Sequence, residues 1–256
     1  MSVVEVTYSG HRADLVLKRP EVLNAMNWDI FEGLAAAADE LAARDDVRVV
    51  VVSGEGRSFC SGIDTGSFGS LAGDPDEMIA VAQSGFRRLA SLPIPTIARV
   101  HGHALGAGLQ LALACDLRIV AEDASLGILE RRFALVPDLG GTQRLPLLVG
   151  PALAKKMIWL GERIDGLEAH RRRLAEVVVP ADDLERATDE LADAIASGPP
   201  LTARKVKELV DIAGRVSLDE GMDGEARAQK EMFASSDFSE AISAFMEKRD
   251  PNYTGS

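Results

Sequence analysis

Short apolar runs alternate with polar segments along the first part of the chain, and their spacing predicts strands and helices in turn. Residues Val3–Tyr8 and Asp14–Leu17 have the composition of two strands on either side of the turn SGHRA. Asn27 is a suitable cap for a helix whose apolar positions recur at helical spacing down to Arg44. The run VRVVVVSG is apolar almost throughout, which is typical of a strand covered on both faces of a largely parallel sheet.

The same alternation continues through the middle of the chain. The Gly/Ser-rich loop GEGRSFCSGIDTGSFGS precedes a predicted helix over Asp74–Ser91, which the prolines of SLPIPT end. A buried strand, TIARV, is followed by a helix in HGHALGAGLQLALACD, a strand in DLRIVAE and an irregular stretch from Ser125 to Gly140. Repeated strand and helix units of this kind predict an α/β fold.

The chain after EVVVP is predicted to be helical to its end. The expected helices are Asp182–Ser197, Leu201–Val210, Leu218–Phe233 and Ser239–Glu247. A helical tail that follows a sheet core often serves assembly. Because no linker or low-complexity segment interrupts the sequence, we expect one continuous domain with a core over residues 1–195 and a helical extension over residues 196–256.

Composition narrows the possible partners and compartment. The chain has 256 residues, 46% of them hydrophobic, which is enough for a full core. With 28 Lys and Arg against 40 Asp and Glu, the net charge of −12 argues against nucleic acid and anionic membranes as main partners. The two cysteines lie in no metal-ligand pattern, no signal peptide is visible, and no apolar run is long enough to span a bilayer. We therefore expect a cytoplasmic protein.

Two Gly-rich turns, FCSGID and GHALGAG, each follow a predicted buried strand. Neither has the spacing of a phosphate-binding loop, and His101 and His103 have no third metal ligand near them in sequence. Turns at the carboxyl ends of neighbouring parallel strands lie side by side, where α/β sheets bind ligands. Two backbone N–H groups there can converge on one oxygen, and one of them, at Ala107, also opens a helix. The alternative is a pair of ordinary glycine turns.

Two carboxylates stand in the apolar stretch ILERRFALVPDLGGTQRL. Glu130 and Asp138 near apolar residues suit raised pKa values and proton transfer. The simpler alternatives are that Glu130 is a surface acid beside Arg131, and that Asp138 only caps the helix near Gly140–Leu148.

Several segments in order resemble the crotonase superfamily, the enoyl-CoA hydratases and isomerases. They are LKRPEVLNAMN, GRSFCSGIDTG, VHGHALGAGLQLALACDLRIV, VPDLGGTQRLPLLVG and AFMEKRDPNY, which together cover essentially the whole chain. The resemblance implies a spiral of ββα units, a C-terminal region that assembles a homotrimer or hexamer, and an acyl-CoA thioester as substrate. It implies no metal and no cofactor apart from the coenzyme A of the substrate.

The resemblance also implies roles for individual residues. The thioester oxygen would be held by the backbone amides of Ile63 and Ala107. The coenzyme A moiety would lie along the segment Val22–Ala25 and the loop Gly62–Thr65, near four cations that could contact its phosphates. The residues expected to bind coenzyme A are Val22, Leu23, Ala25, Gly62, Asp64, Arg19, Arg57 and Lys248. The fourth cation is Arg249, and both Lys248 and Arg249 would come from a neighbouring subunit.

Gln110 stands where hydratases of this family carry one of two catalytic Glu residues, and Glu130 matches the other. Because an amide cannot shuttle protons at neutral pH, Gln110 would orient water or substrate, and double-bond isomerisation is favoured over hydration. Asp138 stands where hydratases typically have Gly, which resembles the dienoyl-CoA isomerases and the dehalogenase branch, where an Asp is the nucleophile. An ordinary 2-enoyl-CoA hydratase of fatty-acid β-oxidation and a non-catalytic acyl-CoA-binding protein are the alternatives.

Overall fold

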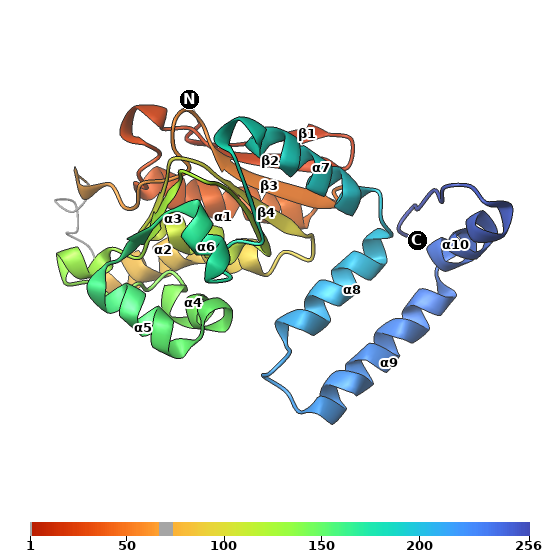
Figure 1. Cartoon of the computed structure of the whole chain (residues 1–256). Helices are drawn as coiled ribbons and strands as arrows, with labels where there is room; N and C mark the ends of the chain where they lie inside the picture. Colours follow the sequence, from red (N-terminus) through yellow and green to blue (C-terminus); the bar gives the residue numbers. More distant parts are fainter. Residues whose placement is uncertain (1, 67–73) are drawn as a thin grey trace.

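The computed structural model describes residues 2–66 and 74–256, and its core is built on two sheets (Figure 1). The strands are β1 (Val4–Ser9), β2 (Arg12–Leu17), β3 (Val49–Gly54), β4 (Thr96–Val100), β5 (His103–Leu105), β6 (Leu117–Ala121), β7 (Ser125–Gly127), β8 (Arg163–Ile164) and β9 (Val177–Val179). The larger sheet has the order β1-β2-β3-β4-β6-β9 and the smaller one β5-β7-β8. The α/β prediction is therefore confirmed.

Helices cover the larger sheet and extend beyond it. The α-helices are α1 (Trp28–Ala42), α2 (Pro75–Ala90), α3 (Ala107–Ala114), α4 (Gly141–Val149), α5 (Pro151–Leu160), α6 (Gly166–Arg171), α7 (Leu184–Ala196), α8 (Pro200–Asp211), α9 (Leu218–Ala234) and α10 (Ser236–Glu247); short 3-10 turns are η1 (Pro20–Val22), η3 (Glu130–Phe133) and η4 (Ala181–Asp183). All six residues of β3 are buried, so both faces of the sheet are covered at its centre. α7 packs on β3, β4 and β6, and α1 packs on β1 and β2.

The chain climbs through the two sheets as a spiral. β4 belongs to the larger sheet, β5 to the smaller sheet, and α3 follows at once. The next turn repeats this order with β6 and β7, which pair in parallel with β4 and β5 respectively. Consecutive turns thus stack on one another, so that the segments after β5 and β7 lie close together.

Most predicted elements are present, and their bounds differ where a short-range contact shifts them. Asn27 caps α1 as predicted, because its side chain accepts a hydrogen bond from the N–H of Ile30 at 3.2 Å. β2 begins two residues earlier than expected, since Ser9 pairs with Arg12 and leaves a two-residue turn in which Gly10 has a φ of +57°.

Other expectations about the elements were wrong or incomplete. The stretch expected to be irregular contains β7 and η3, and α5 and α6 were not predicted. α10 begins at Ser236, three residues earlier than expected, because Ser235 caps it by accepting a hydrogen bond from the N–H of Phe238. Residues 67–70 of the predicted Gly/Ser-rich loop lie outside the described residues.

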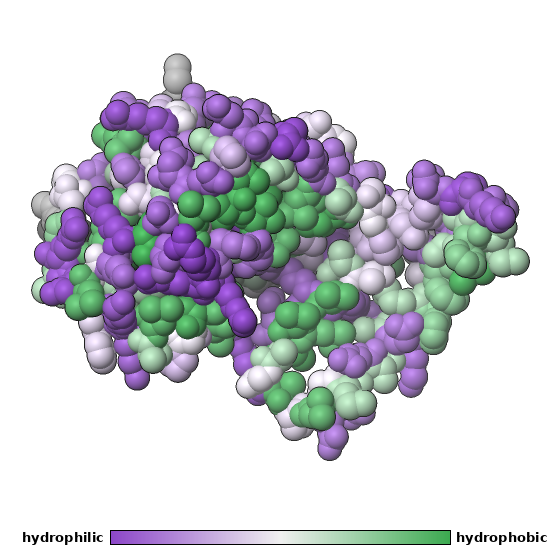
Figure 2. All heavy atoms as spheres, in the orientation of Figure 1, coloured by the Kyte–Doolittle hydropathy of each residue, from purple (hydrophilic) through white to green (hydrophobic). Residues whose placement is uncertain are grey.

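The last three helices project from the core as a tail (Figure 1). They carry apolar side chains that are largely exposed in the single chain, and Figure 2 shows hydrophobic surface over this region. The most exposed of these side chains are Val210, Leu218, Phe233, Phe245 and Met246. The tail thus has the surface that an assembly region needs. The boundary at residue 195 and the trimeric or hexameric state stay predictions.

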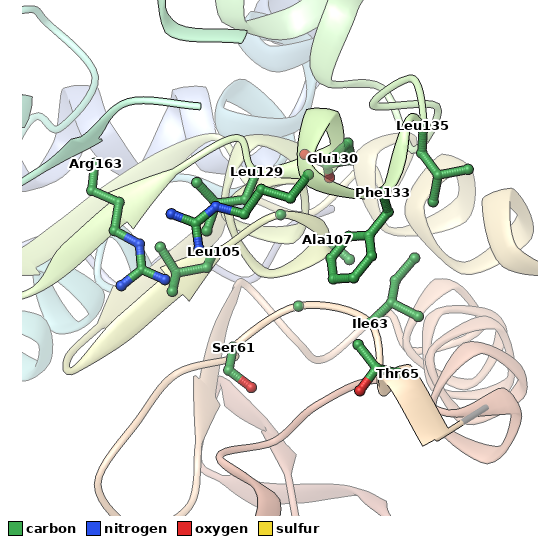
Figure 3. A pocket seen from close by; sticks show the side chains of 13 residues that line it. Ser61, Ile63, Thr65, Leu105, Ala107, Leu129, Glu130, Phe133, Leu135 and Arg163 are labelled. Carbon is green, nitrogen blue, oxygen red and sulfur yellow. The ribbon is translucent and has the colours of Figure 1, made fainter. Parts of the chain in front are cut away.

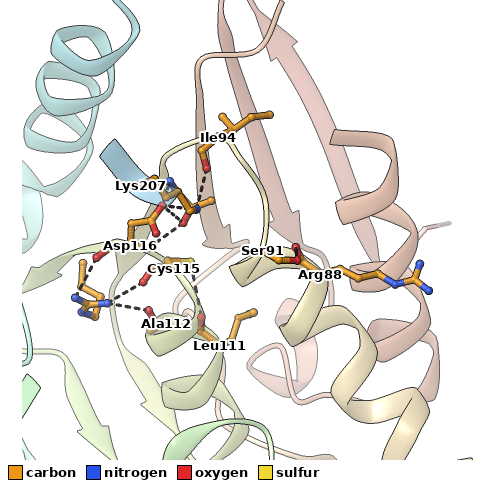
Figure 4. A network of polar contacts seen from close by, with 10 residues as sticks. Arg88, Ser91, Ile94, Leu111, Ala112, Cys115, Asp116 and Lys207 are labelled. Carbon is orange, nitrogen blue, oxygen red and sulfur yellow. Dashed lines mark hydrogen bonds and ion pairs between the residues drawn. The ribbon is translucent and has the colours of Figure 1, made fainter. Parts of the chain in front are cut away.

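A polar network attaches the tail to the core (Figure 4). The ammonium group of Lys207 on α8 lies 2.7 Å from Asp116 Oδ2 and donates a hydrogen bond to the carbonyl of Ile94. The Asp116 carboxylate in turn accepts hydrogen bonds from the N–H and hydroxyl of Thr96 at the start of β4. Because the side chain of Lys207 is almost completely buried, this ion pair fixes the start of the tail on the sheet.

Candidate active site

A backbone pairing brings the two Gly-rich turns together. Cys60 donates its N–H to the carbonyl of His103 at 2.8 Å, and its own carbonyl accepts the N–H of Leu105 at 3.1 Å. Gly62 and Gly106, with φ values of +114° and +54°, stand two residues beyond Cys60 and its bridge partner Ala104. A Cβ at Gly62 would lie 3.0 Å from the carbonyl oxygen of Leu105, so the close approach of the turns requires glycine there.

The residues that follow the two glycines are Ile63 and Ala107. Ala107 is the first residue of α3, so its N–H has no acceptor within the helix. On the other turn, the carbonyl of Gly62 and the N–H of Asp64 both bond to Met26, which directs the N–H of Ile63 to the opposite side. The two residues whose amides are predicted to hold an oxygen thus lie on adjoining turns, and the helix N-terminus favours negative charge at Ala107.

Both residues line one pocket of about 200 Å³ (Figure 3). Figure 3 shows the side chains of Leu129, Glu130 and Phe133 on one side of it, with Ile63 and Thr65 on the facing loop. The lining is mainly apolar and is completed by Ser61, Gly62, Leu105, Gly106, Arg132, Leu135 and Arg163. The arrangement is a small apolar pocket with a carboxylate on one wall and two backbone donors beside it.

Glu130 is the first residue of η3, and only 7% of its surface is exposed. Within residues 2–66 and 74–256, its Oε2 atom is buried without a hydrogen-bond partner. Burial raises the pKa of the Glu130 carboxyl above its ordinary value. The backbone N–H of Glu130, the hydrogen bond from Gln110 and the backbone N–H of Leu129 oppose the rise, and the negative charge of Asp138 adds to it. The alternative that Glu130 is a surface acid is therefore wrong, and its carboxyl has the environment of a proton-transfer group.

Gln110 lies behind Glu130 and does not line the pocket. It is 1% exposed, and its amide nitrogen donates to Oε1 of Glu130 at 2.6 Å. Its amide oxygen accepts the N–H groups of Leu139 and Gly141, both at 2.9 Å. The partner of Gln110 in this structure is thus the Glu130 carboxylate and the loop before α4.

Asp138 is exposed and lines a second pocket, of about 430 Å³, next to the first. Its backbone carbonyl accepts a hydrogen bond from the side chain of Gln83 on α2. The alternative that Asp138 only caps α4 is wrong, because Gly140 occupies the cap position without a side-chain cap, and Gln110 binds the N–H of Gly141 instead. The negative charge of Asp138 is thus near enough to affect the pKa of Glu130, although Asp138 itself is far more exposed to solvent.

Arg19 connects the segment Val22–Ala25, which is expected to bind coenzyme A, to the Gly-rich turn FCSGID. The Arg19 guanidinium donates to the carbonyl of Ala25 at 2.6 Å and lies 3.0 Å from Asp64 Oδ2. Val22 is partly exposed, and Leu23 is in the left-handed region with a φ of 55°. Arg19 therefore joins the two predicted coenzyme A segments, with its charge already beside a carboxylate.

The other three cations predicted for phosphate contact, Arg57, Lys248 and Arg249, are exposed, and Arg249 already pairs with Glu240 on α10. Arg57 lies in the turn after β3, next to the first Gly-rich turn. Lys248 follows α10 at the end of the projecting tail, away from the pocket of its own chain (Figure 1). A role for Lys248 would therefore need a neighbouring subunit.

Two cations and one buried amide around the site are not among the residues predicted from sequence. Arg132 and Arg163 both line the pocket, although they come from η3 and β8. Asn24 is fully buried, and its amide donates to the carbonyls of Glu55 and Ser58. The basic pair in LERRF was the available signal for Arg132, whereas no sequence signal singled out Arg163.

Other kinds of site have no support in residues 2–66 and 74–256. No three His, Cys, Asp or Glu side chains gather there in a way that could hold a metal ion. Among the described helices, none has the length and apolar character needed to cross a membrane.

Comparison with known proteins identifies the family. Residues 12–256 match the family model described as enoyl-CoA hydratase/isomerase. The crotonyl-CoA hydratase of Syntrophomonas wolfei is 35% identical over 243 residues, which cover 94% of each chain. The crystal structure of an enoyl-CoA hydratase from Bacillus anthracis has a TM-score of 0.94 at 35% identity and covers 99% of this chain and 100% of its own.

A Thermobifida fusca relative was solved in complex with acetoacetyl-CoA. It has a TM-score of 0.85 at 38% identity, with 91% of this chain and 95% of that chain covered. The match of the family model, the shared fold and the agreement over almost the whole length lead to one conclusion. This chain belongs to the enoyl-CoA hydratase/isomerase family, the crotonase superfamily, and is an enzyme of that family that acts on acyl-CoA.

Proposed function

We propose that this enzyme moves a carbon–carbon double bond within an enoyl-CoA thioester, with Glu130 as its principal acid–base group. The observation that supports this most strongly is the Glu130 carboxyl, which is buried at the pocket wall with one oxygen unpartnered among the described residues. A buried carboxyl of raised pKa is suited to take a proton from carbon and to return it.

In the proposed reaction, the ionised Glu130 takes a proton from C2 of a 3-enoyl-CoA. The C2–H bond breaks, the electron pair moves to the thioester oxygen, and the amides of Ile63 and Ala107 stabilise the resulting enolate. The double bond then re-forms between C2 and C3 as Glu130 delivers the proton to C4. The Glu130 carboxylate is regenerated, so one side chain both removes and returns the proton.

Hydration is the second candidate, and the name of the Syntrophomonas wolfei relative favours it. Adding water across a 2-enoyl-CoA needs one group that takes a proton from water and one that supplies the proton at C2. Here the position beside Glu130 holds an amide whose oxygen accepts two backbone N–H groups. The amide is therefore a poor partner for an attacking water, and isomerisation is the better fit.

The loops around the pocket are the proposed binding site of coenzyme A. Coenzyme A would run along the segments joined by Arg19 and Asp64, and no cofactor besides the coenzyme A of the substrate is needed. The exposed apolar residues of α8, α9 and α10 support a homotrimer or hexamer, in which Lys248 of another subunit can approach the phosphates.

The test is a parallel incubation of the enzyme with 2-enoyl-, 3-enoyl- and 3,5-dienoyl-CoA, followed by mass spectrometry and NMR. We expect a shifted double bond without change of mass from the 3-enoyl ester. Rapid gain of one water by the 2-enoyl ester, with slower isomerisation, would instead establish the hydratase reaction.

A further inference from the structure

The amide of Gln110 has a fixed orientation in the protein interior. Its oxygen accepts hydrogen bonds from the N–H groups of Leu139 and Gly141, and its nitrogen faces Oε1 of Glu130 at 2.6 Å. Rotating the amide by 180° would put its NH2 group against two N–H donors and its oxygen against a carboxylate oxygen. Both contacts would be repulsive, so the hydrogen-bond network admits one orientation only.

That orientation makes the two oxygens of Glu130 unequal. Oε1 receives the N–H of Gln110, and an oxygen in that position acts as an acceptor and carries no proton toward Gln110. Oε2 is buried and has no partner in the described parts of the chain. A proton taken up by Glu130 therefore belongs on Oε2.

We propose that Gln110 is a positioning residue that makes Oε2 of Glu130 the sole proton carrier of the site. This inference rests on the proposed acid–base role of Glu130 and replaces the expectation that Gln110 orients water or substrate. Because the same amide holds Leu139 and Gly141, it also fixes the loop before α4 relative to the carboxylate. Gln110 acts through Glu130 and does not itself exchange protons.

An amide suits this position because it donates at every pH. An ionised carboxylate at residue 110 would face Glu130 across 2.6 Å, and the two acids would share one proton. The other charged groups around Glu130 are Asp138, which lies in the neighbouring pocket, and Arg132 and Arg163 on the pocket wall. They are common to all the variants below and do not change between them.

The first test replaces Gln110 with Glu, which retains the acceptor for the loop. The singly protonated pair still donates from residue 110 to Glu130, so activity survives near neutral pH. At higher pH residue 110 loses its proton, and we expect a new alkaline limb in the profile of kcat that falls about tenfold per pH unit. The same exchange at Gln229, which is exposed on α9 and lines neither pocket, is the matched control and leaves the profile unchanged.

The second test replaces Gln110 with Met, which has similar volume and no donor. Losing the N–H that stabilises the Glu130 carboxylate moves the acid limb to higher pH and lowers kcat about 10- to 100-fold, while KM changes less than about threefold. Two results would overturn the inference. One is that in Gln110→Met kcat falls and KM rises by similar factors while the pH profile stays in place. The other is a pH profile of Gln110→Glu without an alkaline limb.

A third measurement separates this inference from the proposed reaction. Titration of a 13C-labelled Glu130 carboxyl by NMR reports its pKa without turnover. If the enzyme moves no double bond but Gln110→Met raises this pKa, the reaction is wrong and the positioning role stands. If isomerisation occurs and the pKa is unchanged in Gln110→Met, the positioning role is wrong.

Discussion

Glu130 and Asp138 are carboxylates eight residues apart on one loop, and they occupy opposite environments. Glu130 lies in an apolar wall, is 7% exposed, and receives one N–H from a buried amide. Asp138 is exposed in a wider, more polar pocket between α2 and α4. The same functional group is thus prepared for proton transfer at one position and is solvated at the other.

The two carboxylates differ in burial, which is the property that suits one of them to proton transfer. Burial disfavours the charge on Glu130 and raises its pKa above the ordinary value of a glutamate. Asp138 contributes to that effect from a distance by its negative charge. We therefore propose proton transfer by Glu130 and electrostatic support by Asp138; two changes test that division, and a third tests the backbone amide beside Glu130.

The largest effect is expected from Glu130→Gln. The amide keeps the volume but cannot accept a proton, so kcat should fall by about 10²- to 10⁴-fold while acyl-CoA binding is retained. Steady-state kinetics and calorimetric titration with a saturated acyl-CoA measure the two quantities. Glu122→Gln, at a half-buried position after β6, is the control and should remain fully active. Normal turnover of Glu130→Gln would remove Glu130 from the mechanism.

A smaller loss is expected from Gly62→Ala. The backbone there has a φ of +114°, and a Cβ would lie 3.0 Å from the carbonyl oxygen of Leu105, so the N–H of Ile63 must shift. Loss of one oxyanion donor lowers kcat by about 10²- to 10³-fold. Gly10→Ala is the control, because it has a φ of +57° in open space far from the pocket and tests backbone strain alone. Similar losses of kcat in both variants would contradict the role of the Ile63 amide.

The smallest effect is expected from Asp138→Asn. Removing this negative charge lowers the pKa of Glu130, so the ionised base persists to lower pH and the acid limb of kcat/KM moves down. At the pH optimum kcat should change less than about tenfold, which is below the range for loss of a general acid or base. A pH profile of kcat/KM measures the shift. If Asp138 instead transfers a proton, its loss will match that of Glu130→Gln.

The sequence predicted those features that depend on neighbouring residues. The cap at Asn27, the buried strand β3 and the two Gly-rich turns are local patterns, and the structure has all three. The positions of the Glu130 carboxyl and of the two amides at one pocket followed from a resemblance to a family, since spacing alone left ordinary glycine turns as an alternative.

The partners of buried polar groups could not be predicted, because they come from distant parts of the chain. Gln110 meets Glu130 20 residues away and caps the loop at Leu139 and Gly141, and this contact excluded the local cap by Asp138. Arg19 likewise pairs with Asp64, 45 residues away. Such contacts depend on how the spiral turns stack, which no local pattern encodes.

Deuterium labelling can follow the proton that Glu130 removes from the substrate. A 3-enoyl-CoA with deuterium at C2 is converted in ordinary water, and the product of the first turnovers is analysed by NMR and mass spectrometry. Proton transfer by Glu130 predicts a 2-enoyl product with part of the deuterium at C4, no added water, and no such transfer in Glu130→Gln. Two results would contradict a mechanism in which a single carboxylate removes and returns the proton. One is a product that has gained water, and the other is a product without deuterium at C4 even in the first turnover.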